Sequence, residues 1–162
     1  MSRNAIIFIL SLLVIVGGIG WYQYRFYRTP IDVPVQDSRL IVLGTAQKDD
    51  IPAIDEPVFE SVAGADAYLN DAGYGMVVAV GSRVRFYPFQ LLVWHEAVND
   101  TLGGRDLLVT YDPLTYTSAV YDRTDTFCIS GKVWNSNTLL YDRATESLWS
   151  QLRGEAIEGT LS

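Results

Sequence analysis

A run of twenty residues without a charged side chain, residues 5–24, constrains this chain more than any other feature. A helix rises about 1.5 Å per residue, so such a run reaches roughly 30 Å, the thickness of the hydrocarbon core of a bilayer. A lone segment in that environment satisfies its backbone hydrogen bonds by forming a helix. The sequence therefore predicts a single N-terminal transmembrane helix.

Two other interpretations of the run are a cleaved signal peptide and a buried helix of a soluble domain. A signal peptide ends at a small-x-small site, whereas this run passes from Gly20 directly into Trp21 and Tyr22. A helix that lacks a polar face is atypical of a small soluble domain. Aromatic residues at the end of an apolar helix are typical of the membrane–water interface. We therefore expect residues 1–28 to be a retained anchor with an interfacial belt, which contacts the membrane through residues 5–24.

The side of the membrane on which the remaining chain lies is less strongly indicated. Arg3 precedes the run and Arg25 and Arg28 follow it, so the positive charges of the two flanks nearly balance. A four-residue N-terminal tail most simply stays inside while the larger part crosses. We expect a single-pass membrane protein with an extracytoplasmic domain, in which residues 29–47 form a linker and first strand and residues 48–162 form one globular domain.

The charge and the cysteine and histidine counts exclude several classes of function. All 19 acidic residues but only nine of the 12 basic residues follow residue 28, so this part has a formal net charge of −10. Such a surface repels phosphate backbones, which excludes nucleic acid as a partner. Cys128 is the only cysteine and His95 the only histidine, so neither an internal disulfide nor a cysteine-based zinc cluster is possible. A Cys–His dyad would have to use this one pair, and a buried, unreactive thiol is the simpler interpretation of Cys128.

The pattern of the globular part is typical of an α+β fold that is mainly antiparallel β with one central helix. Residues 76–80 and 83–87 predict a hairpin around the two-residue turn Gly81-Ser82. Residues 90–98 predict the helix, because apolar residues recur there at helical spacing. Short branched and aromatic runs from residue 107 onward predict further strands, and residues 60–70 predict a short helix capped by Ser61.

A group of polar residues on the predicted central helix is the leading candidate site. On a helix, residues four apart share a face, so His95 would lie beside Asn99 and Glu96 beside Asp100. Two carboxylates on one face suit a hard cation or acid–base catalysis, and His95 could join them. The simpler interpretation is a helix end with solvated side chains. The full set of candidate ligand or polar-cluster residues is His95, Glu96, Asn99, Asp100, Asp112, Cys128, Asp142 and Arg143.

Several multi-residue motifs recur here in an order and spacing that resemble a known family. They are Ile51-Pro52-Ala53-Ile54-Asp55, Arg85-Phe86-Tyr87-Pro88, Trp94-His95-Glu96-Ala97-Val98-Asn99-Asp100, Ser130-Gly131, Tyr141-Asp142-Arg143 and residues 145–152. Together they resemble the bacterial and archaeal "domain of unknown function 3179" family, over residues 48–162. The resemblance implies an exported or membrane-tethered protein and no established activity.

The chain departs from the pattern of that family at two cysteines. Members commonly carry a Thr-Tyr-Cys-Pro-Leu-Cys-Gly segment, and the matching residues here place Asp112 and Thr115 where the cysteines would stand. Neither side chain forms a disulfide or offers a soft metal ligand, so a thiol-redox or copper-thiolate role is not expected.

These observations favour a non-enzymatic accessory or structural subunit of a membrane or envelope complex, with other membrane or envelope proteins as partners and without a cofactor. The alternative is a binding or catalytic domain that uses His95, Glu96, Asp100 and Asp112 around a small ligand or a metal ion near His95, and it predicts that these residues converge in one pocket. A third hypothesis is a relative that keeps the fold after losing an ancestral thiol chemistry.

Overall fold

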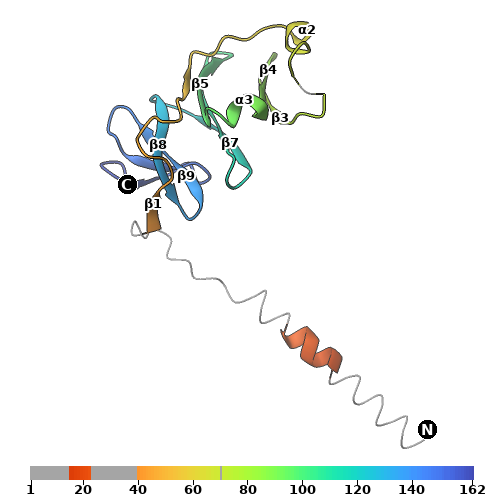
Figure 1. The fold of residues 1–162 in the computed structure, drawn as a ribbon, viewed down its shortest axis with the longest axis vertical. Helices are drawn as coiled ribbons and strands as arrows, with labels where there is room; N and C mark the ends of the chain where they lie inside the picture. The colour runs from red at the N-terminus through yellow and green to blue at the C-terminus, as the bar shows by residue number, and fades with distance from the viewer. Residues whose placement is uncertain (1–14, 23–39, 70) are drawn as a thin grey trace, which may run out of the picture. The chain divides into compact units, whose positions relative to one another are not determined.

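A computed structural model describes residues 15–22, 40–69 and 71–162 in two compact units, residues 1–35 and 36–162. The first unit is helical at residues 15–22 (Figure 1). Most of the predicted transmembrane span lies outside the described residues, and within them no helix has the length and apolar character that crossing a bilayer requires.

The second unit is built from three sheets, and every strand pair except β2–β5 is antiparallel. The five-stranded sheet has the order β1 (Ile41–Leu43), β8 (Phe127–Trp134), β9 (Asn137–Asp142), β10 (Leu148–Ser150) and β11 (Ala156–Glu158). The four-stranded sheet has the order β2 (Ile54–Asp55), β5 (Ala97–Leu102), β6 (Arg105–Asp112) and β7 (Thr117–Asp122). The third is the hairpin of β3 (Gly75–Val80) and β4 (Arg83–Pro88). The prediction of mainly antiparallel β structure is confirmed.

The four-stranded sheet lies between the other two and has a different apolar cluster on each face (Figure 1). Val98, Val109 and Tyr111 face the hairpin and pack against Tyr87 and neighbouring side chains. Ala97 and Leu108 face the other way, against Phe127, Ile129 and Leu140 of the five-stranded sheet. Successive side chains of a strand point to opposite faces, so β5 and β6 each contribute to both clusters.

Two local predictions are confirmed. The β3–β4 hairpin turns at Gly81-Ser82, and Gly81 has a φ of 59°, a conformation that glycine adopts without strain. The cap at Ser61 is confirmed, because its side chain accepts a hydrogen bond from the Gly64 amide at 3.2 Å, but helix α2 covers only Val62–Ala65 of the predicted residues 60–70. Both features depend on neighbouring residues in the sequence.

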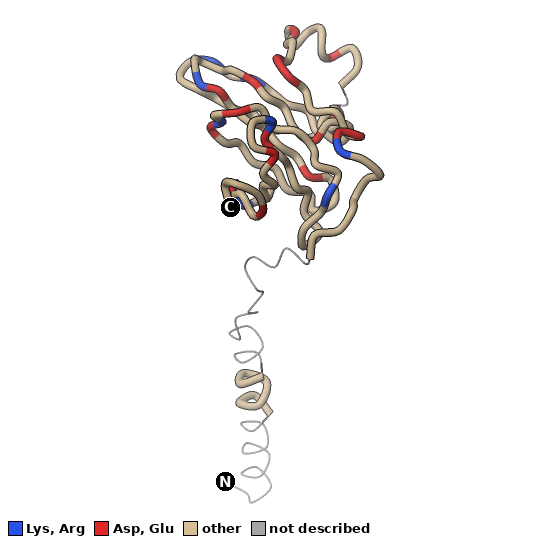
Figure 2. Tube along the Cα trace, turned by 90° about the vertical axis from the view of Figure 1, so that its left-hand side faces the viewer, with Lys and Arg blue, Asp and Glu red and all other residues tan. Residues whose placement is uncertain are grey.

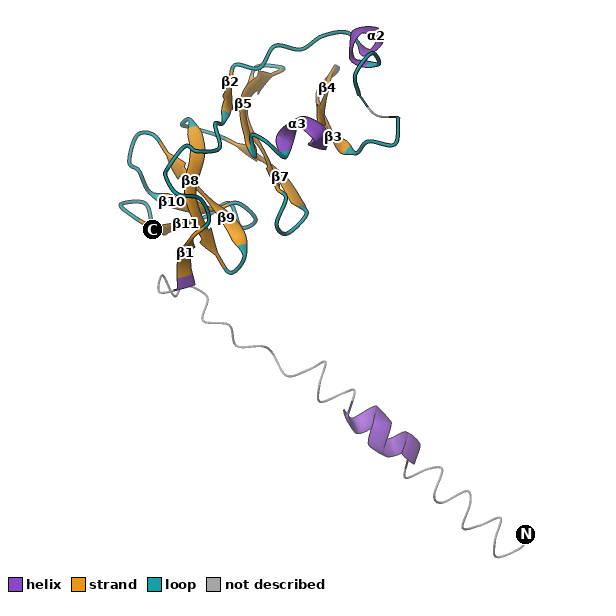
Figure 3. Cartoon of the chain, viewed as in Figure 1, coloured by secondary structure: helices purple, strands orange, loops and turns teal. Residues whose placement is uncertain are grey.

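The central helix predicted over residues 90–98 is wrong in its extent. Helix α3 covers only Phe89–Leu92, and strand β5 begins at Ala97 (Figure 3). Its predicted apolar face does not exist either, because Trp94 is exposed while Val98 is buried in the sheet. Pairing of β5 with β6 along six residues overrides the helical spacing of the apolar side chains.

Candidate functional site

The start of strand β5 at Ala97 separates the residues that the sequence predicts on one helix. Asn99 and Asp100 are neighbours on a strand, so their side chains point to opposite faces of the four-stranded sheet. Asn99 faces the five-stranded sheet and Asp100 faces the hairpin. The predicted pairing of His95 with Asn99 and of Glu96 with Asp100 therefore does not occur.

Asp100 lies in a buried cluster beneath the hairpin. Its Oδ2 accepts a hydrogen bond from the Tyr87 hydroxyl at 2.5 Å, and its Oδ1 forms an ion pair with Arg85. Burial, followed by the hydrogen bond to Asp100, raises the pKa of Tyr87 and keeps its hydroxyl a donor. Asp100 thus joins the hairpin to the central sheet.

Asn99 joins the two large sheets on the other face. Its Nδ2 donates to the carbonyl oxygen of Phe127 at 2.8 Å, and its Oδ1 accepts from the Phe127 amide at 2.9 Å. A third hydrogen bond, 2.9 Å long, reaches Asp55. One amide therefore satisfies both backbone groups of a buried strand residue in the neighbouring sheet.

Replacing Asn99 with leucine is expected to lower the free energy of unfolding by about 2 kcal/mol, because both Phe127 backbone groups lose their partner in a dry interface. Chemical denaturation followed by circular dichroism measures this loss. Asp55→Ala removes the more exposed third bond together with a surface ion pair to Arg143, and is expected to cost less than half as much. Equal losses in the two variants would contradict the role assigned to the Phe127 contacts.

Asp112 is the centre of a polar network buried between the two large sheets. Its Oδ1 accepts from the Leu114 amide at 2.8 Å. Its Oδ2 accepts from the Thr115 hydroxyl at 2.9 Å, from Asn137 Nδ2 at 2.6 Å and from the Thr138 amide at 2.9 Å. The carboxyl group has no exposed surface, and four donors surround its two oxygens. It therefore acts as an acceptor that fixes β9 to the end of β6.

Gln151 extends this network across the sheets and was not among the predicted site residues. Its Oε1 accepts from Asn137 at 2.9 Å and from Thr117 at 3.0 Å, while its Nε2 donates to Thr110 at 2.8 Å. These residues belong to β6, β7, β9 and the turn after β10. Gln151 lies within the motif of residues 145–152, but no local pattern groups it with its three partners, because only the fold brings them together.

Glu96 adds an acidic group at the edge of the same network. Its side chain is buried, and Oε2 accepts a hydrogen bond from the Thr138 hydroxyl at 3.0 Å. Burial, with a smaller contribution from the charge of Asp112, raises the pKa of Glu96 to about 7, whereas the Thr138 hydrogen bond opposes the shift. Its φ of 58° lies in the left-handed region that non-glycine residues rarely adopt. Glu96 and Asp112 are thus two predicted site residues that the structure does bring into electrostatic contact.

The other predicted residues have separate partners. His95 donates from Nδ1 to the carbonyl oxygen of Pro52 at 2.9 Å. Arg143 pairs with Asp55 at 2.8 Å and donates to Cys128 Sγ at 3.1 Å. Burial raises the pKa of the Cys128 thiol, which favours an unreactive neutral form.

Asp142 closes a turn that repeats the turn at Asp112. In each, the aspartate accepts from a threonine three residues later, and that threonine contacts a second hydroxyl two residues further on, Thr117 or Ser147. The spacing Tyr-Asp-x-x-Thr-x-Ser/Thr marks both turns in the sequence and could have identified them. Trp149 Nε1 also donates to Asp142 at 2.8 Å.

The polar groups of these clusters are already satisfied by protein partners. Within residues 15–22, 40–69 and 71–162, no buried side-chain nitrogen or oxygen lacks a hydrogen bond. The same ranges contain no group of three or more His, Cys, Asp or Glu side chains that could hold a metal ion. The network can hold a proton on Glu96 and can fix the sheets to each other.

Comparison with known proteins gives one match. No curated protein and no solved structure matches the chain. Residues 48–162 match the family described as "Protein of unknown function (DUF3179)". This match covers most of the chain and includes all three sheets except β1. The chain therefore belongs to the DUF3179 family.

Proposed function

We propose that this protein is a membrane-anchored, extracytoplasmic and non-enzymatic domain that serves as a structural subunit of an envelope complex. The β3–β4 hairpin docks against the same hairpin of a second copy of the chain. The anchor rests on the uncharged run of residues 5–24. The docking surface rests on the outward face of the hairpin.

That outward face, here called the outer row, is apolar on both strands. The strand register places Val77 opposite Phe86 and Ala79 opposite Val84, and all four side chains are exposed. Val77 keeps 69%, Val84 62% and Phe86 43% of its surface exposed. A hairpin with one buried face normally carries polar residues on the other, so an apolar row on both strands is typical of a surface that a protein partner covers.

The distribution of charge leaves the outer row as a surface on which a second copy can dock. Charged residues are scattered over the domain (Figure 2), and acidic ones predominate. Two copies therefore repel each other over most of their surfaces. The outer row contains no charged side chain, so two copies can meet there across a two-fold axis without opposing carboxylates.

The contact is expected to be too weak to hold a dimer together in free solution, so dimerisation depends on the membrane. Eight apolar side chains, four from each copy, contribute roughly 10 kcal/mol at about 1 to 1.5 kcal/mol each. Association costs an amount of the same order, about 4–15 kcal/mol. The dimer is therefore weak in free solution. Anchoring both copies in one bilayer raises their effective concentration and favours the contact.

Reconstitution of the full chain in lipid vesicles tests the proposal. We expect energy transfer between donor- and acceptor-labelled copies to rise with the protein-to-lipid ratio as a dimer isotherm. Val77→Lys places two ammonium groups in the contact and is expected to weaken dimerisation at least about tenfold, equivalent to 1.4 kcal/mol. Val62→Lys is the matched control, because Val62 is also largely exposed, at 80%, but lies on α2.

Two results would contradict the proposal. The first is a monomer at every protein-to-lipid ratio. The second is a dimer that Val77→Lys and Val62→Lys weaken equally, because the outer row would then have no special role.

A ligand-binding function at His95, Glu96, Asp100 and Asp112 has weaker support. Asp100 and Asp112 face opposite sides of the central sheet, and His95 contacts the Pro52 carbonyl. Only Glu96 and Asp112 interact electrostatically, and protein donors already occupy both.

A further inference from the structure

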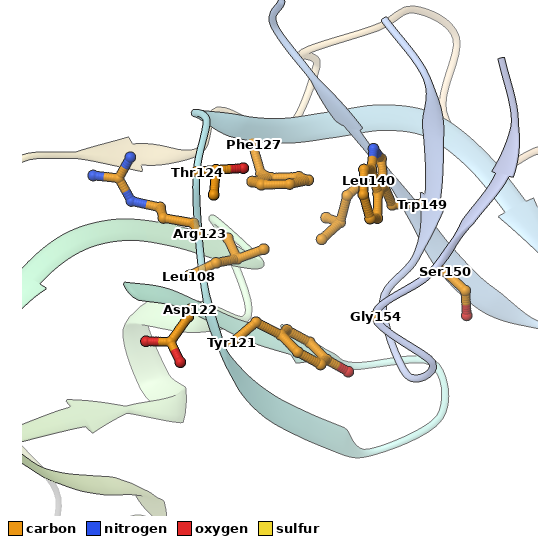
Figure 4. Close-up of a pocket in the computed structure, with 10 residues that line it drawn as sticks. All are labelled: Leu108, Tyr121, Asp122, Arg123, Thr124, Phe127, Leu140, Trp149, Ser150 and Gly154. Carbon is orange, nitrogen blue, oxygen red and sulfur yellow. The ribbon is translucent and has the colours of Figure 1, made fainter. Parts of the chain in front are cut away.

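A pocket of about 160 Å³ lies where the central sheet and the five-stranded sheet diverge (Figure 4). We call it the sheet-edge pocket. Ten residues from both sheets and the segments beside them line it: Leu108, Tyr121, Asp122, Arg123, Thr124, Phe127, Leu140, Trp149, Ser150 and Gly154.

The floor of the sheet-edge pocket is part of the apolar core. Leu108, Phe127 and Leu140 are each at most 8% exposed and belong to the cluster that joins the two sheets. Tyr121 and Trp149 form aromatic walls, and the Phe127 and Trp149 rings meet edge to face at 5.4 Å. The surface offered to a ligand is therefore largely hydrocarbon and aromatic.

The walls are held in place by hydrogen bonds outside the pocket. The Tyr121 hydroxyl donates to the carbonyl oxygens of Gln151 and Leu152, at 2.8 and 3.0 Å. Gly154 packs so closely on the Tyr121 ring that an added Cβ would lie 2.4 Å from it. Trp149 Nε1 is bound by Asp142. These contacts fix both aromatic walls, so the pocket is preformed.

The charged residues of the lining are directed elsewhere. Asp122 pairs with Arg105, and Arg123 donates to the carbonyl oxygens of Leu107 and Asp125. Figure 4 shows both charged groups pointing away from the aromatic walls. A charged ligand would lose its hydration without gaining a partner, so the pocket suits an uncharged one.

We propose that the sheet-edge pocket binds a small, uncharged ring or branched hydrocarbon group. Apolar cavities of about 150 Å³ lined by such side chains bind benzene, which sets the size at about six to eight non-hydrogen atoms. The ring comes from a free small molecule or from the side chain of a partner segment, and the test distinguishes these sources.

Methyl-labelled full chain in lipid nanodiscs, titrated with toluene, tests the proposal. The free toluene concentration is measured in the aqueous phase. We expect saturable shifts of the Leu108 and Leu140 methyl signals and direct magnetisation transfer from toluene to those methyls. Leu108→Phe fills the pocket and is expected to weaken binding at least about tenfold. Leu91→Phe makes the same change at an exposed side chain of α3 and is the matched control.

Two further probes define the ligand class. Benzoate, which has the same ring with a charge, is expected to bind at least about tenfold more weakly than toluene. N-acetylphenylalaninamide represents a partner side chain. Tighter binding of this amide than of toluene identifies a protein segment as the source, and the reverse identifies a free molecule.

The titration of the unaltered chain decides the proposal even if Leu108→Phe fails to fold. Absence of a saturable shift at Leu108 and Leu140 up to the aqueous solubility of toluene would overturn it. Equal binding of benzoate and toluene would overturn the uncharged class.

Discussion

Replacing Asp112 with asparagine is expected to lower the free energy of unfolding by about 4 kcal/mol, although the two side chains have nearly the same shape. Asp112 only accepts hydrogen bonds, and donors surround both of its oxygens. An asparagine must place its NH₂ group against one of them. One orientation sets it against the Leu114 amide and the other against the Thr138 amide, so a buried donor loses its acceptor in either case.

Urea denaturation at neutral pH measures the effect of Asp112→Asn. Asp122→Asn is the matched control, because Asp122 ends the neighbouring strand β7 and its side chain is 65% exposed beside Arg105. That ion pair is a surface one, and its loss is expected to cost less than about 1 kcal/mol. A similar small cost for Asp112→Asn would show that the network tolerates a donor at its centre.

The parts of the fold that follow from neighbouring residues could be predicted from the sequence. The β3–β4 hairpin has a turn glycine, Gly81, between two strand-forming runs, and all of this information lies within 14 residues, 75–88. The Ser61 cap is equally local. The sequence could not show that the helix predicted over residues 90–98 ends early, because the pairing of β5 with β6 sets that end.

The candidate site shows the same limit. The sequence singled out Glu96 and Asp112 but grouped them with Asp100, which faces the opposite layer. Spacing along a helix gave the wrong neighbours, because these residues lie on or beside strands. No sequence pattern links Gln151 and Asn137 to Asp112, because only the packing of two sheets brings the three together. The two Asp-x-x-Thr turns share a spacing in the sequence, so this part of the site is local.

The outer row and the sheet-edge pocket could not be predicted for a related reason. The alternation of side chains along the hairpin determines which residues share a face. It does not determine which face packs on the central sheet. Packing of Tyr87 and Met76 on the central sheet leaves Val77 and Phe86 outside. One wall of the pocket is set by the hydrogen bonds of the Tyr121 hydroxyl to Gln151 and Leu152, which are about thirty residues away in the sequence.

Glu96→Gln is expected to remove a pH dependence of stability between pH 5 and pH 8.5. The pKa of Glu96 is raised to about 7 in the folded chain by burial, from 4.5. The folded state therefore binds this proton more tightly than the unfolded state does. The stabilisation that the bound proton gives the folded state is complete below pH 4.5 and is lost as the pH rises through 7. A pKa shift of this size corresponds to about 3 kcal/mol in the free energy of unfolding.

Because glutamine resembles the protonated acid, Glu96→Gln is expected to match the unaltered chain at about pH 4 and to exceed its free energy of unfolding by up to about 3 kcal/mol at about pH 8.5. Denaturation curves at half-unit pH intervals measure the difference. Glu155→Gln changes an exposed glutamate whose ion pair with Arg153 lies at the surface, so its curve is expected to stay nearly parallel to that of the unaltered chain.

Asp112→Asn removes the nearby negative charge. Combining it with Glu96→Gln separates the two causes of the raised pKa of Glu96, which are burial and the charge of Asp112. If burial dominates, most of the pH dependence persists in Asp112→Asn alone and disappears only with Glu96→Gln. Parallel curves for Glu96→Gln and the unaltered chain would mean that Glu96 is ionised in the fold at neutral pH.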